Sequence, residues 1–507
     1  MEQASTQKST HFRWTIVGLL FFATTVNYLD RQVLSLTWKD FIEPEFHWTN
    51  NDYGNITALF SIFYAISMLF AGKFVDWMDT KKGFLWAIGI WSIGAVLHAF
   101  CGIATSGIIT GNWLVSFEGA KDLIAKVDNI SLIVNTSVAL FIFARLILAI
   151  GEAGNFPAAI KTTAEYFPKK DRALATSIFN AGATVGALAA PLTIPFIAKA
   201  LGWEMAFIII GALGFLWMGL WIFYYKKPHV HPKVNHAELT YIQQDQDDAK
   251  DSNEEETTKF TLKQCFTYKQ TWAFAFGKFM TDGVWWFYLF WTPAYLSSVY
   301  KMDSTQSAFP LFVLYIITLL SIIGGWLPKY FVDKLKLNPY SGRMKAMLIF
   351  AFFPLLALFA QPGGEITYWI PVIIIGVAGA AHQAWSANIF STVGDMFPKK
   401  AIATVTGIGG MAGGIGSFII NKGSGVLFDY AHKTWTTVDG IPLLQKFPKF
   451  ATERIPDHFF EDLQKSGAVI SDGINKGYMI IFSICAVTYL IAWFVMKSLV
   501  PKYQVIK

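Results

Sequence analysis

Four ionisable side chains lie inside two stretches that are otherwise built from apolar residues. Asp30 and Arg31 are adjacent in "TTVNYLDRQVLSL", and Arg145 and Glu152 lie seven residues apart in "FIFARLILAIGEAG". Charges within an apolar helix cost at least ~2.5 to 3.5 kcal/mol each on insertion scales, so they must pair, meet water or face a bundle interior. Guanidinium groups can hold a carboxylate through two parallel hydrogen bonds, and carboxyl groups can carry protons. The pattern predicts a site for an organic anion and a proton.

Helical spacing indicates how these groups can divide the work. Arg145 and Glu152 are two turns apart and share a face of one helix. Neighbours such as Asp30 and Arg31 diverge by ~100°, so one can serve the proton and the other the substrate. A structural alternative stays open, in which Asp30 pairs with Arg145, or Arg31 with Glu152, only to lock two helices together.

The elements that position these residues are predicted to be membrane-spanning helices. The chain has 507 residues, of which 54% are hydrophobic and 15% charged, whereas soluble domains carry about 25% charge. A span needs roughly 20 apolar residues, and twelve windows of that kind lie near residues 13–36, 54–75, 83–106, 134–157, 172–196, 203–225, 271–298, 307–331, 343–361, 367–392, 402–429 and 476–498. The expected fold is therefore an all-α membrane protein with twelve transmembrane helices.

The domain organisation follows from a polar break and an internal repeat. Residues 226–270 are too polar to span and separate a six-helix half at 1–225 from another at 271–507. The segments "EYFPKKDRALAT" and "DMFPKKAIATVT" share acid-x-Phe-Pro-Lys-Lys at an offset of 230 residues, after the fourth helix of each half. Two repeating six-helix halves are one expected sign of a transporter with a site between them.

The distribution of charge predicts the orientation. Lys and Arg gather in the loops after helices 2, 4, 8 and 10, so both termini and the linker are expected in the cytoplasm. Two long loops, near 107–133 and 430–475, are then extracytoplasmic. The net charge of +6 is spread over short clusters between apolar stretches, which argues against nucleic-acid binding. The three cysteines are far apart and show no metal-ligand spacing.

Several motifs resemble a known family. The loop "GKFVDWMDTKKG" fits the signature of the major facilitator superfamily, in which Gly72 would permit a close helix contact and Asp76 could cap a neighbouring helix as part of a gate. "NYLDR", "ARLILAIGEAGNFPAAIKTTAEYFPKKDRA" and "TDGVWWFYLFWTPAYL" resemble the anion:cation symporter family. Within it, they are most similar to bacterial hexuronate transporters.

The resemblance implies import of a sugar-acid anion, a hexuronate such as glucuronate or galacturonate, by proton symport and alternating access. It implies that Asp30 and Glu152 couple the proton, whereas Arg31 and Arg145 contact the anion. A different organic anion such as galactonate, sodium coupling and exchange stay open as alternatives, as do, more remotely, a membrane enzyme and a sensor. Galactonate-type relatives carry a Gln where this chain has Ala183, which weakens the galactonate alternative.

Further substrate contacts are expected from polar and aromatic residues inside the spans. Each also has an ordinary packing role: a tyrosine can fill a core, an amide can join two helices, and aromatic rings collect at membrane interfaces. Lys278 and Asp282, at i and i+4, are interpreted as an intrahelical ion pair whose lysine extends towards the cytoplasm, and a second contact for the anion stays open as the alternative. The predicted contacts, besides the two arginines, are Tyr28, Tyr64, Asn180, Trp285, Gln383, Trp385 and Asn388.

The remaining expectations concern partners and place. We expect no cofactor, no metal and no enzymatic activity, because the chain shows no catalytic or metal-binding motif. The partners are a small organic anion, a proton and the lipid bilayer. The protein is expected to function as a monomer in the cell (inner) membrane.

Overall fold

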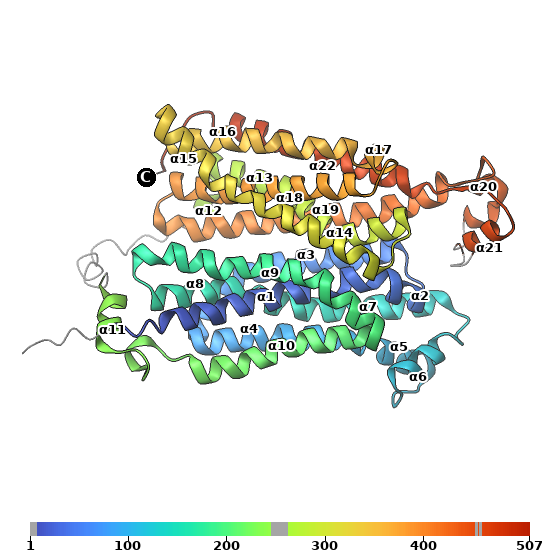
Figure 1. Cartoon of the computed structure of the whole chain (residues 1–507), viewed down its shortest axis with the longest axis horizontal. Coiled ribbons are helices and arrows are strands. Elements are labelled where there is room, and N and C mark those ends of the chain that lie inside the picture. The colour runs from blue at the N-terminus through green and yellow to red at the C-terminus, as the bar shows by residue number, and fades with distance from the viewer. Residues whose placement is uncertain (1–7, 245–261, 452–454, 456–458, 507) are drawn as a thin grey trace, which may run out of the picture.

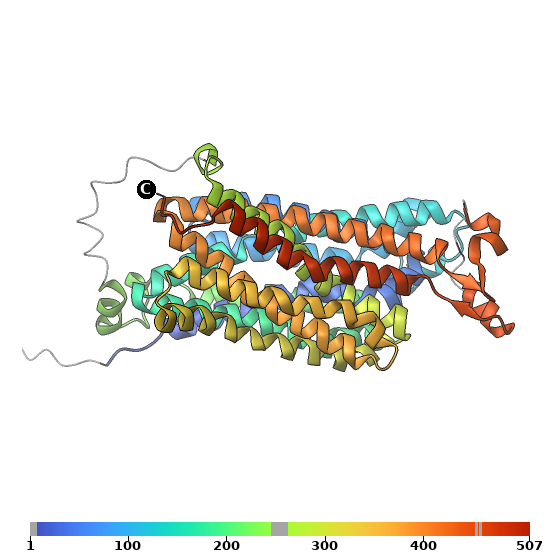
Figure 2. The same ribbon diagram turned by 90° about the horizontal axis from the view of Figure 1, so that it is seen from above.

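The protein is a bundle of long helices in two groups that lie side by side (Figure 1). The computed structural model describes residues 8–244, 262–451, 455 and 459–506. We call helices α1 to α10 the N-terminal helix group and helices α13 to α22 the C-terminal helix group. α1 begins and α22 ends at one end of the bundle, the terminal end, whereas the two long loops project from the opposite end, the loop end (Figures 1 and 2).

The N-terminal helix group contains six long passes along the bundle and several short helices. Its elements are α1 (Arg13–Thr37), η1 (Trp38–Ile42), α2 (Glu43–Phe46), α3 (Asn50–Met78), α4 (Thr80–Ala99), α5 (Cys101–Thr110), α6 (Phe117–Ile124), α7 (Ile130–Glu152), α8 (Asn155–Tyr166), α9 (Lys169–Leu201) and α10 (Trp203–Tyr224).

The C-terminal helix group follows a link made of η2 (Pro228–Val230), α11 (His236–Gln243) and α12 (Leu262–Cys265). Its elements are α13 (Lys269–Tyr300), α14 (Ser304–Thr318), η4 (Leu319–Ile322), α15 (Ile323–Leu335), α16 (Pro339–Phe352), η5 (Phe353–Phe359), α17 (Ala360–Gly364), α18 (Trp369–Met396), α19 (Lys399–Thr434), β1 (Thr437–Val438), β2 (Ile441–Pro442), α20 (Leu443–Lys446), η6 (Pro448–Ala451), α21 (Phe459–Lys465), β3 (Ile470–Ser471) and α22 (Ile474–Leu499).

Nine helical segments of the described residues are long and apolar enough to cross a membrane. Three further helices, α1, α13 and α19, are of spanning length, 25, 32 and 36 residues, but are less apolar. Together they account for the twelve windows of the sequence. The three less apolar helices carry Asp30, Lys278 and a glycine-rich stretch, and they can do so because neighbouring helices cover their polar positions.

The structure adds detail at three places in the predicted pattern of spans and loops. The window at 83–106 is split, because α4 ends at Ala99 and the chain turns at Phe100 before α5. The long loop at 107–133 contains α6. The loop at 430–475 contains a three-stranded sheet, in the order β2-β1-β3, over a small core of Val438, Leu443 and Phe450.

The polar link is anchored on the start of α1. Glu238 of α11 accepts hydrogen bonds from the backbone amides of Phe12 and Arg13 at 3.0 and 3.1 Å and from Arg13 Nη1 at 3.2 Å. A carboxylate at a helix N-terminus satisfies free amides and favours the helix dipole. The link therefore positions α1 from the terminal end. Part of the predicted linker, residues 245–261, lies outside the described residues.

The two groups meet closely along α3 and α19. The helices approach where Gly54 faces Gly425, since a Cβ on Gly54 would lie 3.1 Å from the Gly425 Cα atom. At the loop end, Asp429 accepts from the backbone amides of Asn50 and Asn51 at 3.0 and 2.9 Å, so an acid of α19 caps the N-terminus of α3. Lys422 Nζ donates to the side-chain oxygen of Asn51 at 2.6 Å. The loop end is thus closed between the groups.

Candidate functional site

The strongest polar contact in the interior joins α1 to α7. Arg31 Nε and Nη2 both donate to Glu152 Oε2, at 3.0 and 2.7 Å. Both residues are buried, with 5% and 1% of their surface exposed. Of the two ion pairs that the sequence left open, the structure contains Arg31 with Glu152. The pair places one buried charge on α1 and one on α7. Removing one partner of a buried ion pair typically costs about 3 to 5 kcal/mol.

Four aromatic rings surround the Arg31 guanidinium. Its Cζ atom lies 4.9 Å from the ring centre of Tyr64, 5.1 Å from that of Tyr28, 5.2 Å from that of Trp286 and 5.9 Å from that of Phe60. Cation–π attraction holds a guanidinium over ring faces at such distances. Because α1, α3 and α13 supply these rings, the cage contains residues from both helix groups.

Asp30 and Arg145 complete the cluster without direct hydrogen bonds. Both are 2% exposed, and they lie close enough to interact electrostatically with each other and with Glu152. Neither Asp30 carboxyl oxygen has a hydrogen-bond partner among the described residues, and the same holds for Arg145 Nε and Nη1. The Arg145 Cζ atom lies 5.2 Å from the Phe60 ring centre. Buried polar groups of this kind normally have partners, so this part of the cluster is suited to a polar ligand or water.

A break in the fourth long pass positions Glu152. α7 ends at Glu152 and α8 begins at Asn155, with a turn at Ala153 and Gly154. The break lies tightly against α4, since a Cβ on Gly151 would lie 2.2 Å from the Trp91 backbone nitrogen and one on Gly154 2.6 Å from Ala87 Cβ. Only glycine allows this approach, which fixes the carboxylate at the level of Arg31.

The predicted residues of the C-terminal helix group are placed in different ways. Trp285 stacks on His382, with ring centres 5.4 Å apart and planes within 2°. Trp385 is fully buried and packs edge-on against Tyr489 at 5.6 Å. Asn388 is buried, and its Nδ2 atom donates to the carbonyl oxygens of Gly324 and Ala384, both at 2.8 Å. These side chains contact their own helix group.

Two predicted amides lie apart from these contacts. Gln383 is partly exposed on α18, and Asn180 is exposed on α9. No contact described for the chain joins either residue to the Arg31 cluster. Their assignment to the substrate stays a prediction.

Two residues around Arg31 and one directly after the helix break were not among the predicted site residues. Phe60 and Trp286 belong to the cage around Arg31, and Asn155 is fully buried directly after the helix break. Trp286 stands next to the predicted Trp285, so the 100° step of a helix decides which indole reaches Arg31. In the sequence, Asn155 could have been noticed as an amide three residues after Glu152.

Lys278 and Asp282 form another ion pair inside the protein. The distance from Nζ to Oδ2 is 2.7 Å, and the side chains are 5% and 15% exposed. The expected intrahelical pair is present, but the lysine does not extend to the aqueous surface. Its Nζ atom lies 4.2 Å from the Phe390 ring centre. The Asp282 carboxylate and the ring together satisfy the ammonium group inside the protein.

The gate motif differs from its predicted geometry. A Cβ on Gly72 would meet nothing within 4 Å, so Gly72 does not lie at a close helix contact; the contact falls instead at Gly83, 3.0 Å from Val75 Cα. Asp76 pairs with Lys161 Nζ at 3.0 Å, and its side chain is 74% exposed. Along α3, Asp76 lies two turns beyond Leu69, and Leu69 approaches Gly407 of α19. In this conformation, the ion pair of Asp76 therefore joins two helices of the N-terminal helix group.

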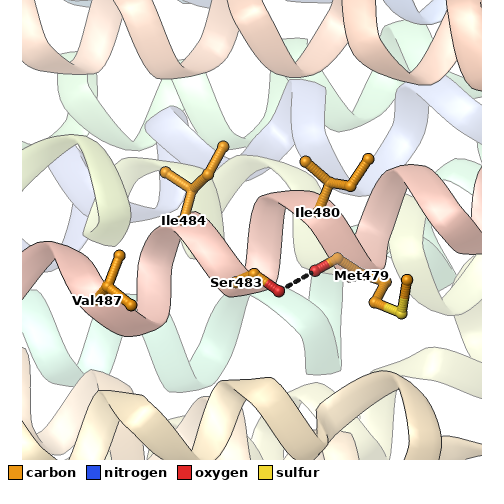
Figure 3. A pocket seen from close by; sticks show the side chains of 5 residues that line it. All are labelled: Met479, Ile480, Ser483, Ile484 and Val487. Atoms are coloured by element: carbon orange, nitrogen blue, oxygen red, sulfur yellow. Dashed lines mark hydrogen bonds between the residues drawn. The ribbon is translucent and has the colours of Figure 1, made fainter.

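A separate depression on α22 is a poor candidate for an anion. It is lined by Met479, Ile480, Ser483, Ile484 and Val487 (Figure 3). Ser483 Oγ donates to the Met479 carbonyl oxygen at 2.8 Å, so its hydroxyl is already used. Met479, Ile484 and Val487 are each more than 40% exposed. An exposed apolar face on a spanning helix is suited to contact with lipid.

The fold and the buried charge cluster together define a membrane transporter of two helix groups. The family model of the Major Facilitator Superfamily matches residues 20–420, and the chain belongs to this superfamily. The resemblance in the sequence is thereby confirmed, as is the fold class. The family's members are transporters and not enzymes, so the protein is a multi-pass membrane transporter.

Among its relatives are carriers of acidic sugars. The chain is 26% identical over 432 residues to a hexuronate transporter of Escherichia coli (strain K12), covering 83% of this chain and 89% of the relative. It is 25% identical to a galacturonate transporter of Dickeya chrysanthemi, covering 69% and 92%. It is also 25% identical to a probable galactarate/D-glucarate transporter of Escherichia coli (strain K12), covering 84% and 90%.

Solved structures of this fold are similar at low sequence identity. A bacterial homolog of the human lysosomal transporter Spinster, inward-facing and unoccupied, has a TM-score of 0.68 at 18% identity, covering 98% of this chain and 99% of the other. A D-xylose–proton symporter has a TM-score of 0.60 at 16% identity, covering 97% and 99%. These likenesses concern the fold alone.

Proposed function

We propose that the protein imports a sugar-acid anion, a hexuronate such as glucuronate or galacturonate, by proton symport and alternating access. The observation that carries the proposal is the buried Arg31–Glu152 pair beside Asp30 and Arg145. The cluster holds two cations that can bind an anion and two acids that can hold protons. Relatives known as transporters of hexuronate, of galacturonate and of galactarate or D-glucarate are consistent with an acidic sugar.

Arg145 is the primary contact for the substrate carboxylate in this proposal. Its Nε and Nη1 atoms are buried and have no partner among the described residues, and a guanidinium can donate both to one carboxylate. The rings of Tyr28, Tyr64 and Trp286 gather around the neighbouring Arg31. Such rings can stack on the apolar face of a sugar. Asn180, Trp285, Gln383, Trp385 and Asn388 remain further candidates for contacts with the sugar.

The Arg31–Glu152 pair provides the coupling. If Arg31 moves to the substrate, Glu152 is left as a buried carboxylate without its counter-charge, which is costly. Protonation of Glu152 removes that charge, so binding the anion and binding the proton favour each other. Asp30, which has no hydrogen-bond partner in the described part of the chain, serves as the second proton site. Neither ligand then crosses efficiently alone.

Alternating access follows from movement between residues 1–225 and 271–507, linked by 226–270. We place both termini and the link in the cytoplasm of the cell (inner) membrane, because the lysine-rich loops lie at the terminal end. The long loops are then extracytoplasmic, and the Asp429 contacts with α3 close the outer side in an inward-facing state. Gly72 and Asp76 would act on the cytoplasmic side in the opposite state. One chain supplies the whole cluster, which supports a functional monomer.

Uptake into liposomes tests the proposal and its alternatives. Purified protein is reconstituted and supplied with labelled glucuronate, galacturonate, galactonate or glucarate under an imposed pH or sodium gradient. We expect at least one hexuronate to accumulate under the pH gradient and not under the sodium gradient. Accumulation with sodium alone would overturn proton coupling, and accumulation of only another anion would overturn the substrate class.

The variant Glu152→Gln tests the coupling step separately. Glutamine keeps the shape but cannot be deprotonated, so we expect proton-driven accumulation to fall at least tenfold while counterflow, which needs no net proton movement, continues. Glu45→Gln is the control, because it makes the same substitution at a half-buried acid that lies at the loop end. Intact accumulation in Glu152→Gln would show that Glu152 is not the coupling acid.

A further inference from the structure

Two fully buried amides lie next to the charge cluster and make no hydrogen bonds with the protein. Asn27 on α1 and Asn155 on α8 are both 0% exposed. Neither the oxygen nor the nitrogen of either amide has a partner among the described residues. An unsatisfied buried polar atom destabilises the fold, and here four such atoms belong to two residues. Packing alone does not explain amides at these positions, since leucine would fill the same space without that cost.

The helix register places both amides on the same side of the Arg31–Glu152 pair. α1 runs from the terminal end to the loop end, whereas α7 and α8 run in the opposite direction (Figure 1). Asn27 precedes Arg31 by four residues and Asn155 follows Glu152 by three, which shifts both by about 4.5 to 6 Å towards the terminal end. Because α1 packs against α8 and Arg31 is bonded to Glu152, the amides lie at one level.

The unpaired atoms of this region are balanced between acceptors and donors. The acceptors are the two amide oxygens, both Asp30 oxygens and Glu152 Oε1; the donors are the two amide nitrogens, Arg145 Nε and Nη1, and Trp91 Nε1, which approaches Asp30 too loosely for a well-formed hydrogen bond. A bare sodium ion would bind oxygens only and leave the donors unsatisfied. Water both donates and accepts, and buried waters typically make about three hydrogen bonds. The atom types therefore favour water over sodium.

We propose that Asn27 and Asn155 hold buried water between Asp30 and Glu152, through which the coupling proton passes from one acid to the other. The inference rests on the proposed proton symport and adds two positioning residues to it. Its geometric basis is the set of unpaired polar atoms on α1, α4, α7 and α8, at the break between α7 and α8. Neither amide contacts the substrate in this scheme.

The transfer is a simple proton relay. The O–H bond of protonated Asp30 breaks as its proton moves to the oxygen of a bound water, and that water releases one of its own protons to Glu152 Oε1. The total number of protons is unchanged, and Asp30 becomes a carboxylate near Arg145. Protonated Glu152 can then release Arg31 for the substrate. The amides orient the water by donating to it and accepting from it.

The leucine variants Asn27→Leu and Asn155→Leu test the relay in liposomes. We expect each to lower pH-driven accumulation of the hexuronate at least tenfold and to abolish substrate-dependent proton entry, followed with a pH-sensitive dye. Counterflow should stay within about twofold of wild type, because the amides do not touch the substrate. Asn27→Ser and Asn155→Ser leave a hydroxyl group and room for water, so they should retain most of the coupling.

Two threonines supply matched controls on the same helices. Thr24 on α1 and Thr162 on α8 are fully buried, and each hydroxyl donates within its own helix, to Leu20 O at 3.0 Å and Ala158 O at 2.8 Å. Thr24→Val and Thr162→Val remove a buried polar group nearby and should leave both measurements unchanged.

The outcomes separate this inference from the proposed function. If wild-type protein does not accumulate hexuronate under a pH gradient, the proposed symport itself is wrong. If wild type accumulates it and both leucine variants do so equally well, only the water relay is wrong. Loss of counterflow in the leucine variants, with normal valine controls, would assign the amides to substrate binding or packing and would also overturn the relay.

Discussion

The two helix groups carry buried charges in opposite ways. In the N-terminal helix group, Asp30, Arg31, Arg145 and Glu152 come from two separate passes, and only Arg31 and Glu152 are bonded to each other. In the C-terminal helix group, Lys278 and Asp282 lie one turn apart on the single helix α13 and pair at 2.7 Å. One cluster joins different helices and leaves polar atoms available, whereas the other closes on itself.

The difference indicates which group does the chemistry and which supports it. An intrahelical pair can form in any conformation, because its partners move together. A pair between α1 and α7 can be exchanged for contacts with a ligand, and its loss must be compensated by a proton or an anion. The aromatic residues follow the same division, since Trp286 reaches across to Arg31 while Trp285 stacks on His382 within its own group.

Neutralising each ion pair as a unit should show the largest contrast. In Arg31→Met/Glu152→Gln we expect hexuronate transport to fall to background, because the anion contact and the coupling acid are both removed. In Lys278→Met/Asp282→Asn we expect uptake within about threefold of wild type, since replacing both members leaves no unpaired charge and such replacements are often neutral. Initial uptake rates in liposomes at equal protein content measure both.

The single variant Lys278→Met qualifies that comparison. It leaves Asp282 buried without its partner and should reduce the amount of folded protein more than the double variant does. If the double variant in α13 abolished transport in well-folded protein, the C-terminal pair would be a functional site and the contrast between the groups would fail.

Substituting the two adjacent indoles should give a smaller effect. Trp286→Leu removes one ring from Arg31, and cation–π contacts are worth about 0.5 to 2 kcal/mol, so KM should rise by roughly 2- to 30-fold. Trp285→Leu should raise KM less than Trp286→Leu does and should lower the melting temperature, because this ring packs on His382 and not on Arg31. Equal changes of KM in both variants would contradict the division between them.

The cluster itself was predictable, because charges in apolar helices are costly and must have a reason. Asp30, Arg31, Arg145 and Glu152 were therefore identified from residue type and spacing. The choice between the two possible ion pairs was not predictable, since it depends on the break after Glu152 and on the contact of Gly151 with α4. That contact is a property of two helices packed together.

Asn388 illustrates why the contacts of other predicted site residues could not be read from the sequence. Its amide donates to the Gly324 carbonyl oxygen, whose ordinary partner four residues later is Pro328, which has no N–H group. A free carbonyl on α15 therefore attracts an amide from α18. The proline is visible in the sequence, but the neighbouring helix that compensates for it is not.

The smallest effect should come from two acids at the loop end, which extend the same contrast. Burial raises the pKa of Glu45 to about 7, despite a hydrogen bond from Trp203 Nε1, and Glu204 and Glu118 nearby act in the same direction while Lys121 opposes them. For Asp472, burial acts upwards too, but the hydrogen bond from His432 Nδ1 and the Ile474 amide hold its pKa below the usual value. Asp472 is thus bonded to a histidine, whereas the partner of Glu45 is an indole N–H.

These opposite shifts predict opposite pH dependences of thermal stability. Between pH 4.5, the ordinary value for a glutamate, and about 7, folded Glu45 keeps a proton that the unfolded chain has lost, so its contribution destabilises the fold as the pH rises. Glu45→Gln should therefore raise the melting temperature at pH 8 by roughly 1 to 3 °C for a chain of this size and have no effect at pH 4.5.

Asp472 stabilises the fold above the ordinary pKa of an aspartate and loses that contribution on acidification, so Asp472→Asn should lower the melting temperature at pH 8 and lose its effect in strong acid. Melting curves of both variants in detergent measure the two signs, and the same sign for both would show that the local partners of the two acids do not control their titration.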